Sequence, residues 1–410
     1  MINKTILTEI ITSQREKILK QDSGISREKL KDLKFRSGSA LIISGIRRCG
    51  KSTLLKQILD KSKNFHYLNL EDPRLDGFEL KDFNRVKEIF EEQQGLKGIY
   101  FFDEIQNVQN WEKFIRFLVD DKKTIIITGS NASLLSRELG TRLTGRHINY
   151  ELFPFSYNEF LKFKKLNSGI KSYKQYFRDG GFPEFLENKD NYYLNEILSS
   201  VVMRDIAVRH GIKNSGLLRK IAIYLISNVG KEFSYNSLKK IFEVGSVRSV
   251  IDYVSYFEDA YLLFTIPKFS YSYKKQQVNP KKVYSIDNGF SYANSVSFSK
   301  DLGKMLENQV FLYLRKKYSE IFYFQKNKEC DFIVKFKEKI KGAIQVCYEL
   351  NEENQNREIK GLLEAISELK LKQGLILTFN QEDEFKIENK KIIVKPVWKW
   401  LLEKEKLTYS

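Results

Sequence analysis

Cysteine and histidine are scarce in this chain. Its 410 residues include three cysteines, Cys49, Cys330 and Cys347, and three histidines. The cysteines are far apart, form no CxxC pair and do not cluster with the histidines. The sequence therefore argues against a structural zinc site and against a disulfide framework.

Long apolar runs are missing as well. No stretch approaches the roughly 18 to 20 uninterrupted apolar residues of a membrane-spanning helix, and the first residues lack the apolar region of a signal peptide. We therefore expect a cytoplasmic protein without membrane association. A hydrophobic content of 42% is enough for several packed cores, and the length is typical of about three domains.

The formal net charge of the chain at pH 7 is strongly positive, at +18. Such a field attracts polyanions, which makes double-stranded DNA a candidate partner. A composition that is simply rich in lysine explains the charge equally well. Charge alone therefore leaves both interpretations open.

Short apolar, β-branched runs alternate with amphipathic stretches in the first half of the chain. The runs cover residues 41–43, 65–68, 99–102 and 124–127. They predict buried strands of a parallel α/β sheet covered by helices on both faces. Residues 1–37 precede this domain as a helical lead-in, with an apolar spacing at Ile6, Ile10 and Ile11.

The second half changes in character after Pro154. Helical patterns continue to about residue 260, including one helix from Ser246 to Phe257, and two strand-like runs follow around a basic, tyrosine-rich loop. This order is typical of a winged-helix-like module. The predicted segments are a lead-in at 1–37, an ATPase domain at 38–165, a helical and winged-helix-like region at 166–290, and a smaller α/β domain at 291–410.

One loop motif has a specific chemical meaning. The chain reads Gly45-Ile46-Arg47-Arg48-Cys49-Gly50-Lys51-Ser52, followed by Thr53, and so matches GxxxxGK[ST] between a strand and a helix. Backbone N–H groups of such a Walker A loop hold phosphate oxygens of ATP. We expect Lys51 to reach the β- and γ-phosphates and the Ser52 hydroxyl to bind Mg²⁺.

Carboxylates follow at the end of a later apolar strand, in the Walker B arrangement. Asp103 is expected to hold the magnesium shell, and Glu104 to polarise the attacking water. Asn131 follows the next strand and is expected to contact water or the γ-phosphate. Arg142 and Arg146 lie a little further on, where an arginine could stabilise transition-state charge, although a basic surface loop explains either residue equally well.

The chain resembles the prokaryotic AAA+ ATPases often described as archaeal-type ATPases. The resemblance lies in GIRRCGKSTLL, LNLEDPRL, FFDEIQNVQNWEKFIRFL, TGSNASLLSRELGTRLTGRH and ELFPFSYNEF. It covers nearly the whole chain and is most specific between residues 41 and 160. It implies an AAA+ core with Asn131 as sensor, with Arg142 or Arg146 as arginine finger, and with assembly into a homo-oligomer.

The last segment has the layout of the PD-(D/E)XK nuclease-like fold. Glu307 lies on a predicted helix, Asp331 on a strand, and Gln345 and Cys347 on the next strand, where active members carry Glu-x-Lys. The replacements remove one negative ligand for magnesium and one cation that could activate water. We therefore expect the fold without cleavage, and a true nuclease using Asp331 remains an alternative.

Together these patterns predict an ATPase that hydrolyses ATP with Mg²⁺ and couples hydrolysis to DNA binding. The predicted recognition helix offers only Arg248 as a basic group, so the basic, aromatic loop at 271–275 is better suited to phosphate contact. The alternative is a nucleotide-dependent switch that binds a protein partner in signalling or defence.

Overall fold

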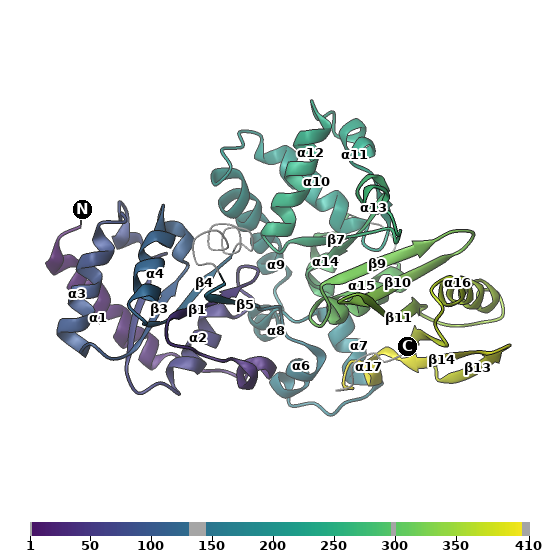
Figure 1. The fold of residues 1–410 in the computed structure, drawn as a ribbon, viewed down its shortest axis with the longest axis horizontal. Coiled ribbons are helices and arrows are strands. Elements are labelled where there is room, and N and C mark those ends of the chain that lie inside the picture. The colour runs from purple at the N-terminus through teal and green to yellow at the C-terminus, as the bar shows by residue number, and fades with distance from the viewer. Residues whose placement is uncertain (1, 131–144, 297–300, 404–410) are drawn as a thin grey trace. The chain divides into compact units, whose positions relative to one another are not determined.

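The computed structural model describes residues 2–130, 145–296 and 301–403. These residues form two compact units (Figure 1). The N-terminal unit comprises Met1–Phe153 together with Asp259–Tyr261, and the C-terminal unit comprises Pro154–Glu258 and Leu262–Ser410. The four segments expected from the sequence divide the chain more finely, and their boundaries remain predictions.

The N-terminal unit is built on a five-stranded sheet in the order β2-β3-β4-β1-β5. Its strands are β1 (Ser39–Ser44), β2 (Phe65–Asn69), β3 (Ile99–Asp103), β4 (Thr124–Gly129) and β5 (His147–Glu151). All neighbouring strands are parallel, which confirms the predicted parallel sheet. The sequence analysis missed β5, because its residues are only partly buried and form no apolar run.

Helices cover both faces of this sheet. They are α1 (Lys4–Lys20), α2 (Lys51–Leu59), α3 (Asp82–Gln94) and α4 (Trp111–Asp120). The chain moves from β1 across to β2 and then back through β3 to β4, so right-handed crossovers place α2 on one face and α3 and α4 on the other. One hydrophobic core joins α1, α3 and α4 to alternate strand residues such as Ala40 and Ile42.

His66 of β2 is buried in the aromatic part of that core. Its ring stacks on Phe90 at 5.2 Å between centroids and lies 4.5 Å from the ring of Tyr100. Nδ1 is 3.0 Å from Oε1 of Gln94. Burial lowers the pKa of His66 to about 4, so the folded protein keeps this imidazole neutral at neutral pH.

The C-terminal unit begins with packed helices. They are α6 (Tyr157–Lys164), α7 (Ile170–Asp179), α8 (Pro183–Asn188), α9 (Asn191–Ser200) with a π-helical continuation over Val201–Val208, and later α14 (Asn288–Asn294). None of the helices in the described parts of the chain is long and apolar enough to cross a membrane.

Short helices and a small sheet follow in the same unit, at the place of the predicted winged-helix-like module. Its elements are α10 (Ser215–Ser227), β6 (Glu232–Phe233), α11 (Tyr235–Ile241), α12 (Val247–Asp259), β7 (Leu263–Pro267), α13 (Tyr273–Val278) and β8 (Lys281–Ser285). The three strands form an antiparallel sheet in the order β6-β8-β7. The segment between β7 and β8 was expected to be a loop, but it contains α13, whose first turn is capped by the Ser272 side chain.

A mixed α/β part completes the unit. It contains α15 (Leu302–Arg315), β9 (Glu320–Gln325), β10 (Glu329–Phe336), β11 (Lys339–Val346), α16 (Gln355–Glu368), β12 (Gln373–Thr378), β13 (Asp383–Ile387), β14 (Lys390–Pro396) and α17 (Val397–Trp400). The sheet order is β13-β14-β12-β11-β10-β9, with β11, β12 and β14 parallel and the outer pairs antiparallel. The smaller α/β domain expected here is therefore present.

The neutral state of His66 predicts acid sensitivity. An unfolded histidine has a pKa of about 6.5, so the stability contributed by His66 is full above that pH and is lost as the pH falls towards about 4. His66→Phe keeps an aromatic ring but cannot take up the proton. We expect thermal unfolding to show that the wild type loses roughly 2 to 3 kcal/mol more than this variant between pH 6.5 and 4. An equal loss of stability in wild type and His66→Phe between these pH values would contradict the assignment.

Candidate nucleotide-binding site

The loop between β1 and α2 leaves the carboxyl end of a central strand. Gly50 has a φ of 99°, in the region that favours glycine, and it directly precedes the first residue of α2. A Cβ atom at Gly45 would collide with the carbonyl oxygen of Leu152. N–H groups in the first turn of a helix have no carbonyl partner within the helix, so this loop presents the N-terminus of α2 to a phosphate.

Lys51 lies across its own loop. Its Nζ donates to the carbonyl oxygens of Gly45 at 3.1 Å and Ile46 at 3.3 Å, and it lies 3.3 Å from Oε1 of Glu104. The side chain is almost completely buried. The ammonium group is thus held where the two predicted nucleotide motifs meet.

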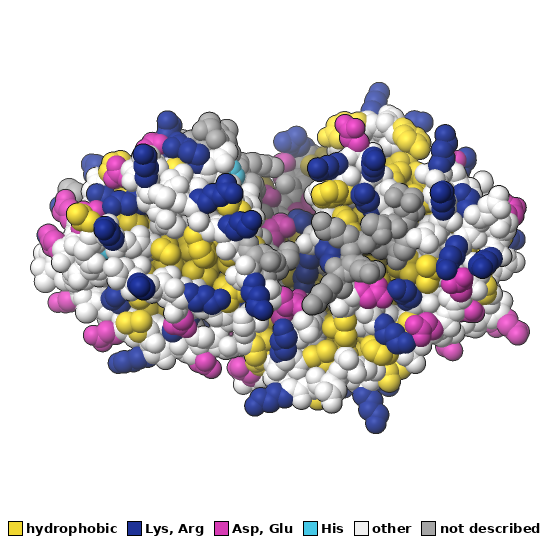
Figure 2. Space-filling view, turned by 60° about the horizontal axis from the view of Figure 1, so that its bottom comes forward, with side chains coloured by type: hydrophobic (Ala, Val, Ile, Leu, Met, Phe, Trp, Pro, Cys, Tyr) yellow, Lys and Arg dark blue, Asp and Glu magenta, His cyan; other side chains and the backbone are white. Residues whose placement is uncertain are grey.

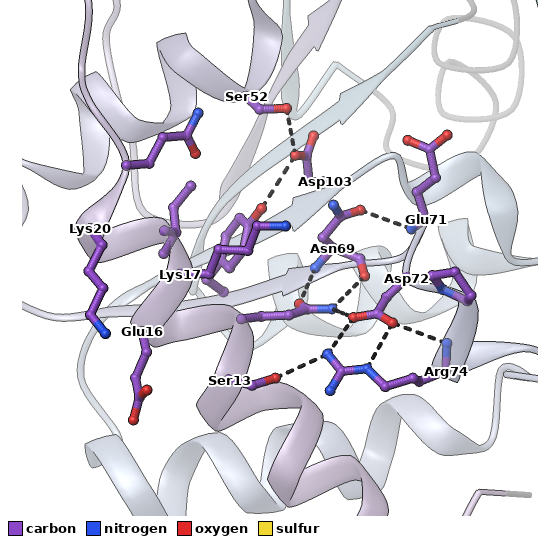
Figure 3. Close-up of a pocket in the computed structure, with 15 residues that line it drawn as sticks. Ser13, Glu16, Lys17, Lys20, Ser52, Asn69, Glu71, Asp72, Arg74 and Asp103 are labelled. Carbon is purple, nitrogen blue, oxygen red and sulfur yellow. Dashed lines mark hydrogen bonds and ion pairs between the residues drawn. The ribbon is translucent and has the colours of Figure 1, made fainter.

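Asp103, the last residue of β3, joins the two motifs from the other side. Its Oδ2 accepts from the Ser52 hydroxyl at 2.9 Å and from the Tyr67 hydroxyl at 3.4 Å (Figure 3). Its Oδ1 accepts from the hydroxyl of Thr128 on β4. Burial, followed by the charge of Glu104, raises the pKa of Asp103. A divalent cation beside this carboxylate would offset both effects.

Glu104 follows β3 with an unusual backbone conformation for a residue other than glycine, at a φ of 51°. Its N–H donates to the Thr128 hydroxyl at 3.0 Å, and the Gln106 amide donates to its Oε2. Burial is the largest single effect and opposes ionisation, but the Lys51 ammonium, the Gln106 amide and the Arg47 charge together outweigh it and lower the pKa of Glu104. Glu104 is therefore an ionised carboxylate that can accept a hydrogen bond from water.

These groups suit a magnesium–nucleotide ligand. A hydroxyl and a carboxylate oxygen 2.9 Å apart, at Ser52 and Asp103, are the hard oxygen donors that Mg²⁺ prefers. Lys51 supplies a cation and the loop supplies a helix N-terminus for phosphate oxygens. The predicted residues Ile46, Cys49 and Thr53 lie in the same loop and the first turn of α2.

A cavity of ≈ 1150 Å³ adjoins the Ser52–Asp103 pair (Figure 3). Its wall includes side chains of α1, and Gln14 of that helix donates to the carbonyl oxygen of Asn69 and to Oδ2 of Asp72, both at 3.0 Å. Asp72 also accepts from Arg74 at 2.7 Å. The segment 71–74 was noted from the resemblance alone, and these bonds give it a physical role in fixing α1 beside the site.

The arginines considered as phosphate ligands lie at different distances from the Walker A loop. Arg47 of the loop pairs with Glu71 at 2.5 Å, and Arg48 has a φ of 67°. Arg146 pairs with Asp120 at 2.7 Å and precedes β5 at the amino edge of the sheet. The loop lies at the opposite edge, about 16 Å away along β1. Arg146 therefore does not reach the phosphate site of its own chain. Its exposed pair with Asp120 fits the alternative of a basic surface residue, and a finger role towards a neighbouring chain stays a prediction.

Other predicted residues fall elsewhere. Asn131 and Arg142 lie outside the described residues. In the C-terminal unit, Glu307, Asp331, Gln345 and Cys347 line one cavity, as predicted. Cys347 lies just past the end of β11, and its thiol donates to the carbonyl oxygen of Glu349.

Arg27 is a site residue that the sequence analysis missed. Although it lies in the polar lead-in, it is buried, and its guanidinium donates to the carbonyl oxygens of Cys49 at 3.0 Å and Phe153 at 2.7 Å. It thereby fixes the Walker A loop to the segment after β5. No signal in the sequence identified it, because one of its partners lies 126 residues away.

Loss of Arg27 should weaken nucleotide binding. Arg27→Met leaves two buried carbonyl oxygens without a charged donor, at a cost of roughly 2 to 4 kcal/mol, and frees the Walker A loop. We expect the Kd for a fluorescent ATP analogue to rise about tenfold or more. The exposed Arg36 provides the control, and Arg36→Met should bind like the wild type. An unchanged Kd in a folded Arg27→Met protein would contradict this role.

Comparison with known proteins agrees with the geometry. The profile of an AAA domain matches residues 37–161, and that of a domain of unknown function (DUF8612) matches residues 170–300. Over 98% of its length the chain is 37% identical to the uncharacterized protein MJ1544 of Methanocaldococcus jannaschii, of which 96% is covered. It is 31% identical to an uncharacterized protein of Haemophilus influenzae, over 88% of this chain and 94% of that protein.

Among solved structures, the Aeropyrum pernix ORC1 protein in complex with DNA is 11% identical, with a TM-score of 0.32, over 71% of this chain and 90% of that one. Likeness at that level carries no conclusion about function. The family is instead shown by the two relatives that match nearly the whole chain at 37% and 31% identity. The chain therefore belongs to the family of these two uncharacterised proteins, and its N-terminal unit carries an AAA+ P-loop ATPase domain.

Proposed function

We propose that the protein hydrolyses ATP with Mg²⁺ and couples hydrolysis to DNA binding. The observation that supports this most directly is the meeting of two motifs about 50 residues apart in the sequence. Ser52 lies 2.9 Å from Asp103, and Lys51 lies 3.3 Å from Glu104. This is the set of groups that phosphoryl transfer to water requires.

Each group has a separate task in this proposal. Ser52 and Asp103 would hold Mg²⁺, which would supply positive charge beside the phosphate oxygens. Lys51 binds the phosphates, and Glu104 orients water by accepting its proton in a hydrogen bond. Because Lys51 also pairs with Glu104, turning its ammonium towards a phosphate frees the carboxylate for water. Substrate binding would thereby activate the base.

The role of Glu104 predicts a separation of binding from turnover. Glu104→Gln keeps the size of the side chain but removes the charge that orients water, so steady-state assays should show kcat lowered roughly 10²- to 10³-fold with ATP affinity retained. Lys51→Ala should lose binding itself. Glu92→Gln removes an exposed carboxylate that pairs with Lys4, and it should hydrolyse ATP like the wild type. Wild-type turnover by Glu104→Gln would rule out this assignment.

The DNA part of the proposal is supported by a local surface. Lysine and arginine side chains are spread over the face in Figure 2 without gathering into one patch. Arg248 of α12 is paired with Asp252 at 3.2 Å, which makes that helix a poor reader of bases. Around α13, by contrast, Tyr271 and Tyr273 are 79% and 74% exposed and are followed by Lys274 and Lys275. Exposed aromatic rings beside lysines suit stacking and phosphate contact.

A route for coupling starts at Tyr261. This residue follows α12 in the chain but packs within the N-terminal unit, where its hydroxyl shares a 2.7 Å hydrogen bond with Ser44 and donates to Glu151 at 3.3 Å. Ser44 directly precedes Gly45 of the Walker A loop. A rearrangement of that loop on hydrolysis would therefore act on the chain that leads to the winged-helix-like module.

The surface around α13 predicts a salt-dependent response to DNA. The double variant Lys274→Ala/Lys275→Ala should lose most of the stimulation of ATP hydrolysis by double-stranded DNA and should retain basal hydrolysis. In the wild type, stimulation should weaken as salt rises. Lys370→Ala/Lys372→Ala removes two exposed lysines elsewhere in the unit and serves as the control.

Hydrolysis that is indifferent to DNA at both salt concentrations would instead favour the second candidate, a nucleotide-dependent switch that binds a protein partner. One observation already favours it, because Val278 of α13 is 72% exposed beside the exposed tyrosines. An apolar surface of this kind suits a protein interface.

A further inference from the structure

Lys282 lies at the centre of a carboxylate cluster in the C-terminal unit. Its Nζ is 2.9 Å from Oε1 of Glu307 on α15. The same Nζ contacts two carboxylates of β10, Oδ1 of Asp331 at 2.9 Å and Oε1 of Glu329 at 2.6 Å. Lys282 is 1% exposed. The contacts with Glu307 and Asp331 are hydrogen bonds and the contact with Glu329 is an ion pair, so the ammonium group faces three carboxylates.

Glu307 and Asp331 are the two carboxylates that a nuclease of this fold would use to hold a metal ion. Their remaining oxygens are also committed. Glu307 accepts from the Tyr284 hydroxyl at 2.7 Å on Oε1 and from Lys304 at 2.7 Å on Oε2. Oδ2 of Asp331 accepts from the N–H of Val346 at 2.9 Å. All four carboxylate oxygens of Glu307 and Asp331 therefore already accept from protein donors, with which Mg²⁺ would have to compete.

Gln345, the third position of the motif, is held in the same way. Its Oε1 accepts from the N–H of Asp331 at 3.2 Å, and its amide donates to Glu358 at 2.6 Å. Across the described residues, no group of three or more histidine, cysteine or acidic side chains is arranged to hold a metal ion. Two ammonium groups beside Glu307 would moreover repel a divalent cation. The residues present do not fit the metal that the fold implies.

Lys282 also differs from a lysine that activates water. A cavity of ≈ 460 Å³ reaches the cluster, and its wall includes Glu307, Glu329 and Asp331. Lys282 is enclosed behind these carboxylates, and its ammonium group lies within 2.9 Å of all three. A water molecule in the cavity would meet the carboxylates rather than the ammonium.

We propose that the Lys282 ammonium is the resident cation of this site, in the place of a divalent metal ion. The cluster binds no Mg²⁺ and cleaves no DNA through one. Its task is to join β8 of the winged-helix-like module to α15 and β10 of the nuclease-like part. This inference does not depend on the proposed hydrolysis of ATP.

Binding of Mn²⁺ to the full chain, followed by electron paramagnetic resonance without nucleotide, tests the proposal. Lys282→Met removes the cation and leaves the carboxylates, so this variant should gain one Mn²⁺ per chain relative to the wild type. Mn²⁺ should also raise the Tm of Lys282→Met but not that of the wild type. The gain should disappear in Lys282→Met/Asp331→Asn. Any metal held at the Walker A loop is common to all variants and cancels.

Lys281→Met is the matched control, because it removes a lysine from the same strand that lies outside the cluster, over the ring of Tyr235. It should bind Mn²⁺ like the wild type. The proposal is overturned by a folded Lys282→Met protein that gains no Mn²⁺, or by metal-dependent nicking of DNA that Lys282→Met abolishes. If Lys282→Met does not fold, Mn²⁺ binding by the wild type and by Asp331→Asn is compared instead. A Mn²⁺ site in the wild type that Asp331→Asn removes overturns the proposal. Equal Mn²⁺ binding by the two proteins supports it.

Discussion

The burial of charge at the carboxyl edge of the parallel sheet is the constraint around which the N-terminal unit is organised. Lys51, Asp103 and Glu104 are all nearly inaccessible to water. Removing an ion from water costs several kcal/mol unless partners replace the lost hydration. Thr128, Tyr67 and Gln106 supply such partners from neighbouring segments. The sheet order explains how they reach the site, because the carboxyl ends of β1, β3 and β4 meet at one edge.

Local patterns made much of this architecture predictable. Four central strands followed from apolar runs, and the Walker A loop followed from eight consecutive residues between a strand and a helix. The Asp103–Glu104 pair was recognisable because it ends an apolar strand. In each case the signal lies within a few residues of the feature that it predicts. The strand β5 gave no such signal, since its side chains are half exposed and it is held by pairing with β1.

Groups that act across long stretches of sequence were not predictable. Arg27 reaches Phe153 over 126 residues, and Lys282 reaches Asp331 over 49. Neither residue belongs to a motif, and each lies in a segment whose composition looks unremarkable. Only the packing of distant elements gives them partners. The missing Glu-x-Lys at Gln345 and Cys347 predicts that the cluster does not cleave DNA, and this stays a prediction. No local pattern reveals that another lysine enters the cluster from β8.

Lys51 and Lys282, both buried, differ in how firmly they are held. Lys51 contacts two carbonyl oxygens and one carboxylate at 3.1 to 3.3 Å, and the neighbouring Ser52–Asp103 pair borders a large cavity. Lys282 contacts three carboxylates at 2.6 to 2.9 Å. Charge-assisted hydrogen bonds at the shorter distances are the stronger ones. A phosphate can therefore compete for Lys51, whereas a ligand would have to replace three carboxylates to move Lys282. Lys51 of the N-terminal unit can thus exchange its present partners for a phosphate, whereas Lys282 of the C-terminal unit permanently joins β8 to α15 and β10.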